Sequence, residues 1–378
     1  MSIVRTNLTW KHTSIHTGLH SKYGSSTLQI LRPFRSHPRS WSRPNPPILR
    51  PPWRSQFRSG SNQTMTKPIL FTVGVATVAF GTAALWHEHH RLSIYKRLRS
   101  WTRPWEPTVA DAVRYRAQLA RETLRHQLTK LKSWGVPDAV QSAWLSIGEK
   151  WISMRERDQT LAVLIAINTL VFAAWQVPRL QPFMQRWFTH HPSSNRLVTM
   201  LTSAFSHREM WHFAVNMMAL WSFGGVVHDF LGREQFLAFY LTGATTSSLV
   251  SHLVSQSGRR QLVLPSLGAS GALFGCLSAC AVQHPEASVY IIFLPFIPIK
   301  IGVALPCLMA LDVVGLLRGW QLFDHVAHLA GASFGIAYAY QDFGRRMIWN
   351  PLQEQLNEWR KQQQKRLQEE KSRRERWW

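Results

Sequence analysis

Residues 323–335 read FDHVAHLAGASFG, and all but the first lie in the last strongly apolar segment of the chain, residues 324–340. A histidine is costly inside a membrane-spanning helix, so His328 is expected to have a partner or a function there. Gly331 and Gly335 are four residues apart, a spacing that creates a face on which a second helix can approach closely. The segment therefore predicts a spanning helix that places an imidazole beside a close helix–helix contact.

A second segment supplies the group that this imidazole could act on. Residues 268–271 read GASG, and Gly271 and Gly275 repeat the spacing of four. If the two glycine faces meet, the Ser270 hydroxyl and the His328 imidazole come within hydrogen-bonding distance, as a nucleophile and its general base do in acyl transfer. A serine beside a glycine is often only a packing residue. Its pairing with a histidine on a matching face favours catalysis.

His212 and Asn216 form a third polar group, in the apolar segment 210–227. They are four residues apart, so they share one face of a helix. Both side chains can donate hydrogen bonds, which suits an oxyanion hole, and Ser270 at a helix start adds its own unpaired backbone N–H. Hydrogen bonds from His212 and Asn216 to neighbouring helices are the alternative, and the spacing leaves both interpretations open.

The apolar segments predict an all-α polytopic membrane protein with one N-terminal spanning helix and a core of six (1+6). We expect the N-terminal helix within residues 68–87 and the core within residues 159–343. The predicted spans are residues 69–86, 161–175, 210–227, 236–254, 269–282, 301–317 and 324–340. Loops are expected at residues 178–210 and 289–298.

The segments outside the spans are polar and basic. Residues 88–158 carry two apolar stripes of helical spacing, separated at Pro137, which predict amphipathic helices resting on the membrane surface or on the core. The tail, residues 344–378, mixes Lys, Arg, Glu and Gln, which indicates a solvated helix or disorder. The three cysteines all fall in predicted spans, so they indicate apolar packing rather than a disulfide framework.

The N-terminal leader, residues 1–67, is rich in Arg and Ser, and the first acidic residue of the chain is Glu88. Such a leader is typical of a mitochondrial transit peptide, because the membrane potential draws cations inward. The net charge of +24 would also suit a disordered arm that binds nucleic acid. The spanning segments that follow need a route to a membrane, so they favour import.

Taken in order, HxxxN at 212–216, GASG at 268–271 and AHxxGxxxG at 327–335 resemble the motifs of the rhomboid family of intramembrane serine proteases. The leader, the extra N-terminal span and FDHVAHL at 323–329 resemble its mitochondrial, presenilin-associated branch. The resemblance implies a Ser–His dyad that cleaves substrate helices within the membrane, without a cofactor or a metal.

The resemblance also assigns roles to individual residues. Ser270 is the nucleophile and His328 the base; the oxyanion donors are His212, Asn216 and the Ser270 backbone N–H; the supporting residues are Gly268, Gly271, Phe274 and Gly331. His325 competes with His328 for the role of base, and the motif favours His328.

Some positions depart from the family pattern or stay unassigned. Phe274 stands where bacterial members often have a tyrosine, so it can stack on the histidine but offers no hydroxyl. The first loop has Arg186-Trp187 in place of a Trp-Arg pair, which puts the contacts of that loop in doubt. No acid is assigned as a third catalytic member, so packing is expected to orient His328. Asp312, an acid inside a predicted span, is a functional candidate by default; its alternatives are a hydrogen bond between helices or a role in setting His325.

The resemblance implies a multi-pass protein of the mitochondrial inner membrane that acts on single-span membrane proteins, including a dynamin-like GTPase and, in fungi, cytochrome c peroxidase. Nucleic acid is not expected as a partner. The basic linker and tail favour the matrix by the positive-inside rule, whereas the resemblance implies the intermembrane space, which we adopt.

Three other functions compete with this one. A catalytically inactive rhomboid-like binding or quality-control protein is the main alternative, but such relatives lose the serine or the histidine. A transporter would predict ionisable residues along several spans. The sequence HEHHR at 87–91 has Arg91 where a zinc protease needs the second histidine of HExxH, so we reject that function.

Overall fold

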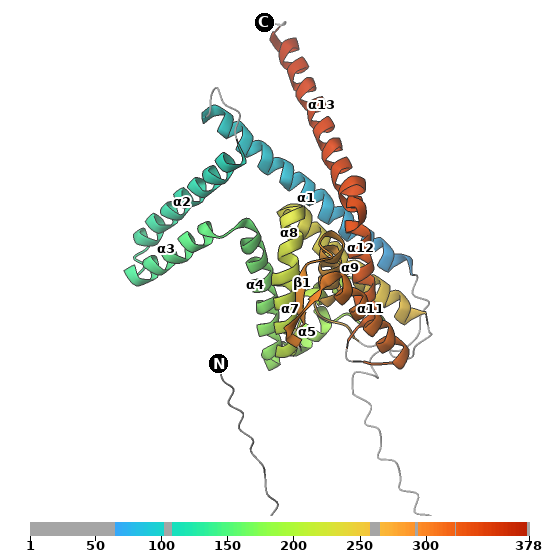
Figure 1. The fold of residues 1–378 in the computed structure, drawn as a ribbon. Coiled ribbons are helices and arrows are strands. Elements are labelled where there is room, and N and C mark those ends of the chain that lie inside the picture. Colours follow the sequence, from blue (N-terminus) through green and yellow to red (C-terminus); the bar gives the residue numbers. More distant parts are fainter. Residues whose placement is uncertain (1–64, 102–107, 258–264, 292–293, 322, 376–378) are drawn as a thin grey trace, which may run out of the picture. The chain divides into compact units, whose positions relative to one another are not determined.

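Every predicted span is helical in the computed structural model (Figure 1). The structure describes residues 65–101, 108–257, 265–291, 294–321 and 323–375, so the predicted leader lies almost wholly outside the described residues. The helices at the predicted spans are α1 (Thr66–Trp101), α4 (Glu156–Gln176), α7 (Met210–Ala219) continued by η4 (Leu220–Gly224) and α8 (Gly225–Leu231), α9 (Arg233–Gln256), α10 (Ser270–Gln283), α11 (Ile301–Arg318) and α12 (His325–Ala339).

Among the described helices, three are long and apolar enough to cross a membrane: Thr66–Ser93 within α1, α4 and α11. The helix α10 is apolar but shorter. The helix α9 is rich in Ser and Thr, and several of these side chains are buried. Buried hydroxyls of this kind bond to the helix backbone, as Thr245 and Ser247 do here.

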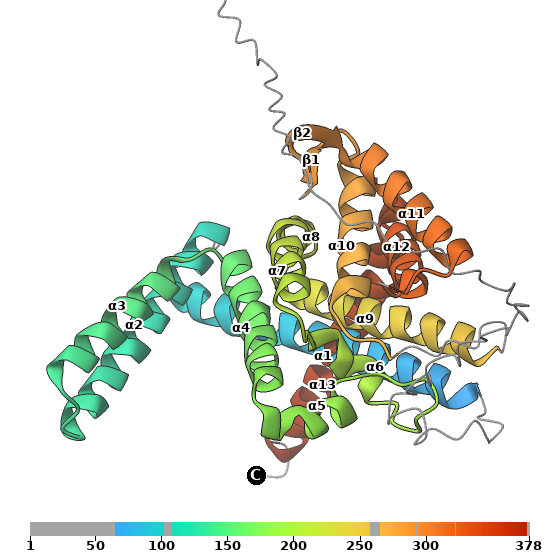
Figure 2. The same cartoon turned by 90° about the horizontal axis from the view of Figure 1, so that it is seen from below.

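The glycine faces of α10 and α12 meet, as their spacing predicts. Figure 2 shows α10, α11 and α12 side by side. A Cβ atom on Gly331 would overlap the carbonyl oxygen of Gly271, and one on Gly335 would overlap that of Gly275. Lipid tails are as apolar as leucine, so helices in a membrane associate through such close packing rather than through hydrophobic burial. This contact fixes α12 against the start of α10.

Both predicted loops contain regular structure, so those predictions are wrong in detail. Residues 178–210 include η2 (Pro178–Leu180), α5 (Gln181–Trp187), α6 (Thr199–Thr202) and η3 (Ser203–Phe205). The second loop forms an antiparallel hairpin of β1 (Ser288–Ile291) and β2 (Leu294–Lys300). Its β-branched residues favour strands, and the prolines of β2 are tolerated because a two-stranded ribbon consists of edge strands.

The linker forms the two predicted helices, α2 (Val109–Ser133) and α3 (Asp138–Ser153). Thr108 and Asp111 make a capping box at the start of α2, and Pro137 separates the helices as expected. Leu124 packs against Gly148, where an added Cβ atom would lie 2.6 Å from the leucine side chain. No residue of α3 is buried, so its apolar stripe does not lie in the core of the described chain.

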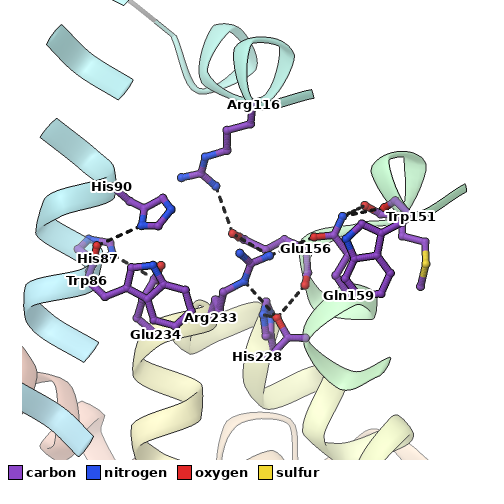
Figure 3. A network of polar contacts seen from close by, with 12 residues as sticks. Trp86, His87, His90, Arg116, Trp151, Glu156, Gln159, His228, Arg233 and Glu234 are labelled. Atoms are coloured by element: carbon purple, nitrogen blue, oxygen red, sulfur yellow. Dashed lines mark hydrogen bonds and ion pairs between the residues drawn. The ribbon is translucent and has the colours of Figure 1, made fainter. Parts of the chain in front are cut away.

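A polar network ties these linker helices to the core (Figure 3). Arg116 of α2 and Arg233 of α9 both contact the Glu156 carboxylate of α4, at 3.1 and 3.4 Å. Gln159 accepts from Arg233 at 3.2 Å and donates to the carbonyl of Trp151, in α3, at 2.8 Å. Each exposed ion pair contributes little alone, but the shared Glu156 makes them a network.

The C-terminal helix α13 (Asn350–Glu375) confirms the helical alternative for the tail, and its side chains are mostly exposed. Its first half also packs on α1, a contact that the sequence did not predict. Glu88 of α1 is only 1% exposed and accepts hydrogen bonds from Arg91, at 2.9 Å, and from Arg360 of α13. Asn357 of α13 accepts from Arg91 at 3.2 Å. A buried carboxylate is stable only when it is paired, so Glu88 provides the reason for the docking.

Candidate active site

Ser270 and His328 lie at hydrogen-bonding distance, with 3.0 Å between Ser270 Oγ and His328 Nε2. Ser270 is the first residue of α10, and His328 lies in the first turn of α12. Asp324 caps α12 by accepting from the N–H of Ala327 at 3.0 Å, and its second oxygen accepts from Ser251 of α9 at 2.7 Å. The cap fixes where α12 begins and the glycine contact fixes its distance from α10, so together they set the position and direction of the His328 imidazole.

Phe274 stacks on His328, as the sequence predicts. The ring centroids are 4.2 Å apart and the planes differ by 14°. Phe274 lies one turn after Ser270 on α10. The ring that restricts the rotation of the His328 imidazole therefore comes from the same helix as the nucleophile. Phe323 lies at 6.0 Å from the same imidazole. Aromatic packing therefore restricts the rotation of His328, but it is not the only restraint.

A carboxylate completes the arrangement, which corrects the expectation that His328 has no acidic partner. Asp312 Oδ1, from α11, lies 3.2 Å from His328 Nδ1 and 2.6 Å from His325 Nδ1. All three side chains are buried. If the Nδ1–H of His328 donates to Asp312, Nε2 is left free to accept the proton of Ser270. Asp312 thus links α11 to α12, as one alternative predicted, and contacts His325, as the other predicted, and it also contacts His328.

His212 lies against the GASG loop. Gly268 has a φ of +124°, and a Cβ atom there would lie 2.6 Å from the His212 ring, so the position requires glycine for both reasons. The ring therefore reaches the residue that precedes Ala269 and Ser270. This placement fits a donor to an oxyanion at Ser270.

Asn216 is buried, and its amide nitrogen donates to the backbone carbonyl of His212 at 2.7 Å. Its Oδ1 has no hydrogen-bond partner within the described part of the chain. Asn216 thus lies on the same face of α7 as His212, but its amide N–H donates to a carbonyl of α7 itself and not to a neighbouring helix. The two interpretations of Asn216 from the sequence both remain predictions.

His207 is a member of the site that the sequence did not indicate. Its Nε2 accepts the backbone N–H of Ala269 at 3.3 Å, and its ring lies 5.1 Å from that of His212. Burial lowers the pKa of His207 to about 3, with a further contribution from His212, so the ring stays neutral and can accept. The sequence offered no signal beyond a histidine placed in a predicted loop.

A small cavity of about 30 Å³ opens beside Ser270. Its lining is rich in hydroxyl groups and includes Ser203, Ser247, Ser266 and Asp324. Polar cavities of this size hold water, whereas apolar ones stay dry. The site can therefore keep water next to the nucleophile within a membrane.

Asp312, His325 and His328 also have the composition of a metal site, since one ligand atom from each lies within 4.8 Å of the others. At 2.6 and 3.2 Å, however, the contacts of Asp312 Oδ1 are hydrogen-bond distances. In the HEHH sequence of α1, Glu88 is already bound by arginines and His87 contacts Glu234 at 3.4 Å. That segment is an ion-pair cluster.

Comparisons with known proteins agree with the resemblance. The family model of the rhomboid domain matches residues 194–345. The mitochondrial presenilin-associated rhomboid-like protein of Mus musculus is 37% identical over 298 residues, covering 79% of this chain and 71% of the relative. Presenilin-associated rhomboid-like protein A of Danio rerio is 36% identical over 78% of this chain and 74% of its own length. Mitochondrial rhomboid protein 1 of Saccharomyces cerevisiae is 36% identical over 47% of this chain and 51% of its own length.

Proposed function

Because the chain belongs to the rhomboid family, in its mitochondrial presenilin-associated branch, we propose that it is a serine endopeptidase that cleaves transmembrane segments of membrane-anchored proteins. The observation that carries the proposal is the 3.0 Å contact between Ser270 and His328. An inactive binding protein would not need a hydroxyl and an imidazole held in this geometry. The basic leader and the mitochondrial relatives support a mitochondrial location, and within the mitochondrion we propose the inner membrane.

Acylation begins when the substrate carbonyl reaches Ser270. Neutral His328 takes the hydroxyl proton at Nε2, and Ser270 Oγ attacks the carbonyl carbon. The imidazolium that forms is stabilised by Asp312 at Nδ1. A substrate helix must unwind to expose its backbone, so segments with small or helix-breaking residues are the favoured substrates.

The tetrahedral oxyanion forms at the N-terminal end of α10, where the Ser270 N–H has no partner within the helix. His212 provides a second donor from α7, because its ring already lies against Gly268. Asn216 becomes a third donor if its amide turns away from the His212 carbonyl. Removal of one such donor typically lowers turnover by about 10²–10³.

The remaining steps return the enzyme to its starting state. His328 gives its proton to the leaving amine, which departs with the C-terminal part of the substrate. Water from the hydroxyl-lined cavity then attacks the acyl-enzyme, with His328 as base again. Hydrolysis releases the N-terminal part and regenerates Ser270.

The test is cleavage of a single-span membrane protein in proteoliposomes. We expect wild-type protein to cut within the transmembrane segment and Ser270→Ala to lose at least about 10⁴ in rate. Ser278→Ala is the matched control, since Ser278 is a buried serine on the same helix whose hydroxyl donates to the Phe274 carbonyl, its one hydrogen bond within the described residues. Cleavage retained by Ser270→Ala would refute the proposal.

A further inference from the structure

His325 is buried and makes a short hydrogen bond, which a residue that only fills space would not need. It is 5% exposed, and its Nδ1 lies 2.6 Å from Asp312 Oδ1, closer than His328 lies to the same oxygen. The helix α11 leaves room for its ring at Gly315, where a Cβ atom would lie 2.5 Å from two ring atoms. Trp320 and Phe323 enclose the ring, at 6.4 and 6.3 Å between centroids. This is a site shaped around an imidazole.

We propose that His325 is a positioning residue that holds Asp312 so that Asp312 can orient His328. This inference rests on the proposed protease function. His325 and His328 are three residues apart on α12, so both rings lie on the face that meets α11. Their Nδ1 atoms converge on one carboxylate oxygen, which gives a hydrogen-bonded series from His325 through Asp312 and His328 to Ser270.

The chemistry of Asp312 explains why a second imidazole is useful. A carboxylate among apolar helices needs donors, and without one it can rotate away or become protonated. Donors to a charged acceptor make shorter and stronger hydrogen bonds than neutral pairs do. His325 provides the short contact, so the longer contact to His328 can change as the proton moves. The base and the positioning residue thus share one oxygen but have different roles.

Removing His325 should therefore slow the chemistry without weakening substrate binding. We expect His325→Ala to lower kcat by about 10-fold to 100-fold, the range typical for loss of an outer partner of a functional side chain. KM should stay unchanged. Asp312→Asn should cost more, up to about 10⁴ in kcat, because an amide can favour the wrong tautomer of the base.

Two further variants separate positioning from structure. His325→Asn retains an N–H donor close to the position of Nδ1, the atom that contacts Asp312, so it should recover most of the rate lost in His325→Ala. Gly315→Ala leaves all four polar groups in place but pushes the His325 ring, so it should lower kcat as His325→Ala does. Gly81→Ala is the control, because a Cβ atom there meets nothing within 4 Å.

The experiment measures kcat, KM and the rate at which a fluorophosphonate labels Ser270 in proteoliposomes. The number of molecules that the fluorophosphonate can label gives the number of active molecules, and kcat is expressed per active molecule. Equal rates per active molecule in wild type and His325→Ala would overturn the inference, and so would an Asn variant no faster than the Ala variant. A stoichiometric divalent metal in purified wild type, absent from His325→Ala, would also overturn it. If wild type itself neither labels nor cleaves, the proposed function fails, which is a separate outcome.

Discussion

Gly331 of α12 lies so close to the backbone carbonyl of Gly271 in α10 that neither helix could approach the other with a larger residue at position 331. Ser270 precedes Gly271, and His328 lies one turn before Gly331, so this contact, together with the Gly335–Gly275 contact and the cap at Asp324, sets the distance between nucleophile and base. The relationship makes the catalytic geometry a consequence of helix packing. It also makes the geometry sensitive to a change that touches neither catalytic side chain.

Gly331→Ala should separate α10 from α12 and lower both activity and stability. The added methyl group overlaps backbone atoms rather than a flexible side chain, and such overpacking costs about 1–3 kcal/mol. We expect slower cleavage and a lower Tm in detergent. Gly74→Ala in α1, where a Cβ atom meets nothing within 4 Å, should change neither quantity. An active Gly331→Ala enzyme would show that the contact does not set the geometry.

Phe274→Leu should lower kcat by about 3-fold to 10-fold, because an aromatic pair contributes about 0.5–1.5 kcal/mol beyond its buried area. The lost contact is the stack on His328 at 4.2 Å between centroids. Phe274→Tyr retains the ring and should keep most of the activity. Steady-state kinetics in proteoliposomes distinguish the variants, and a fully active leucine variant would argue that Asp312 alone orients His328.

Glu88 and Arg360 should prove coupled in stability. Arg360→Ala leaves the buried Glu88 carboxylate with Arg91 as its remaining cation, so α13 should detach from α1. We expect faster proteolysis of residues 350–375. The loss of stability should stay below about 3–5 kcal/mol, the cost of an unpaired buried charge, because Arg91 still pairs with Glu88. Lys371→Ala breaks only an exposed pair with Glu375 and should have no effect. In a double-mutant cycle, additive effects of Glu88→Gln and Arg360→Ala would rule out the coupling.

The His190–His252 pair should make the fold sensitive to acid. His190 Nε2 lies 3.1 Å from His252 Nδ1, and its Nδ1 lies 2.9 Å from the Thr199 hydroxyl. Burial, together with the nearby His252, lowers the pKa of His190 from 6.5 to about 3. The unfolded chain binds this proton at a higher pH than the folded chain does. The stability that His190 contributes is therefore complete above about pH 6.5 and is lost as the pH falls towards 3.

The measurement is apparent Tm against pH for wild type and His190→Gln. For one proton, the slope of the unfolding free energy reaches about 1.4 kcal/mol per pH unit, and the variant should lose that part of the slope. His126→Gln, at an exposed position of α2, serves as the control. Identical slopes in wild type and His190→Gln would contradict the assignment.

The parts of the site that the sequence predicts are those encoded by local spacing. The glycine faces follow from residues one helical turn apart, and the structure confirms that they meet. The contact of Ser270 with His328 follows from where both residues lie beside these faces, and the stack of Phe274 on His328 is expected from the family resemblance. The structure confirms both contacts. The contact of Asp312 with His325 is one of the alternatives that the sequence offers, and the structure confirms it. The contact of Asp312 with His328 could not be predicted, because it depends on how α11 is rotated against α12.

Other features depend on distant parts of the chain. The docking of α13 requires a buried carboxylate in α1, and nothing in the composition of the tail identifies that partner. The β1–β2 hairpin is too short for a periodic pattern to separate it from an apolar loop. His207 joins the site by accepting the backbone N–H of Ala269, and no pattern in the sequence predicts which side chain a backbone N–H will contact.

The most direct test of the central claim is covalent modification by a fluorophosphonate, with the modified residue located by mass spectrometry. The account predicts one labelled position, Ser270, that disappears in Ser270→Ala and is labelled far more slowly in His328→Ala than in wild type. Labelling at another serine, or labelling of Ser270 at an unchanged rate in His328→Ala, would contradict it.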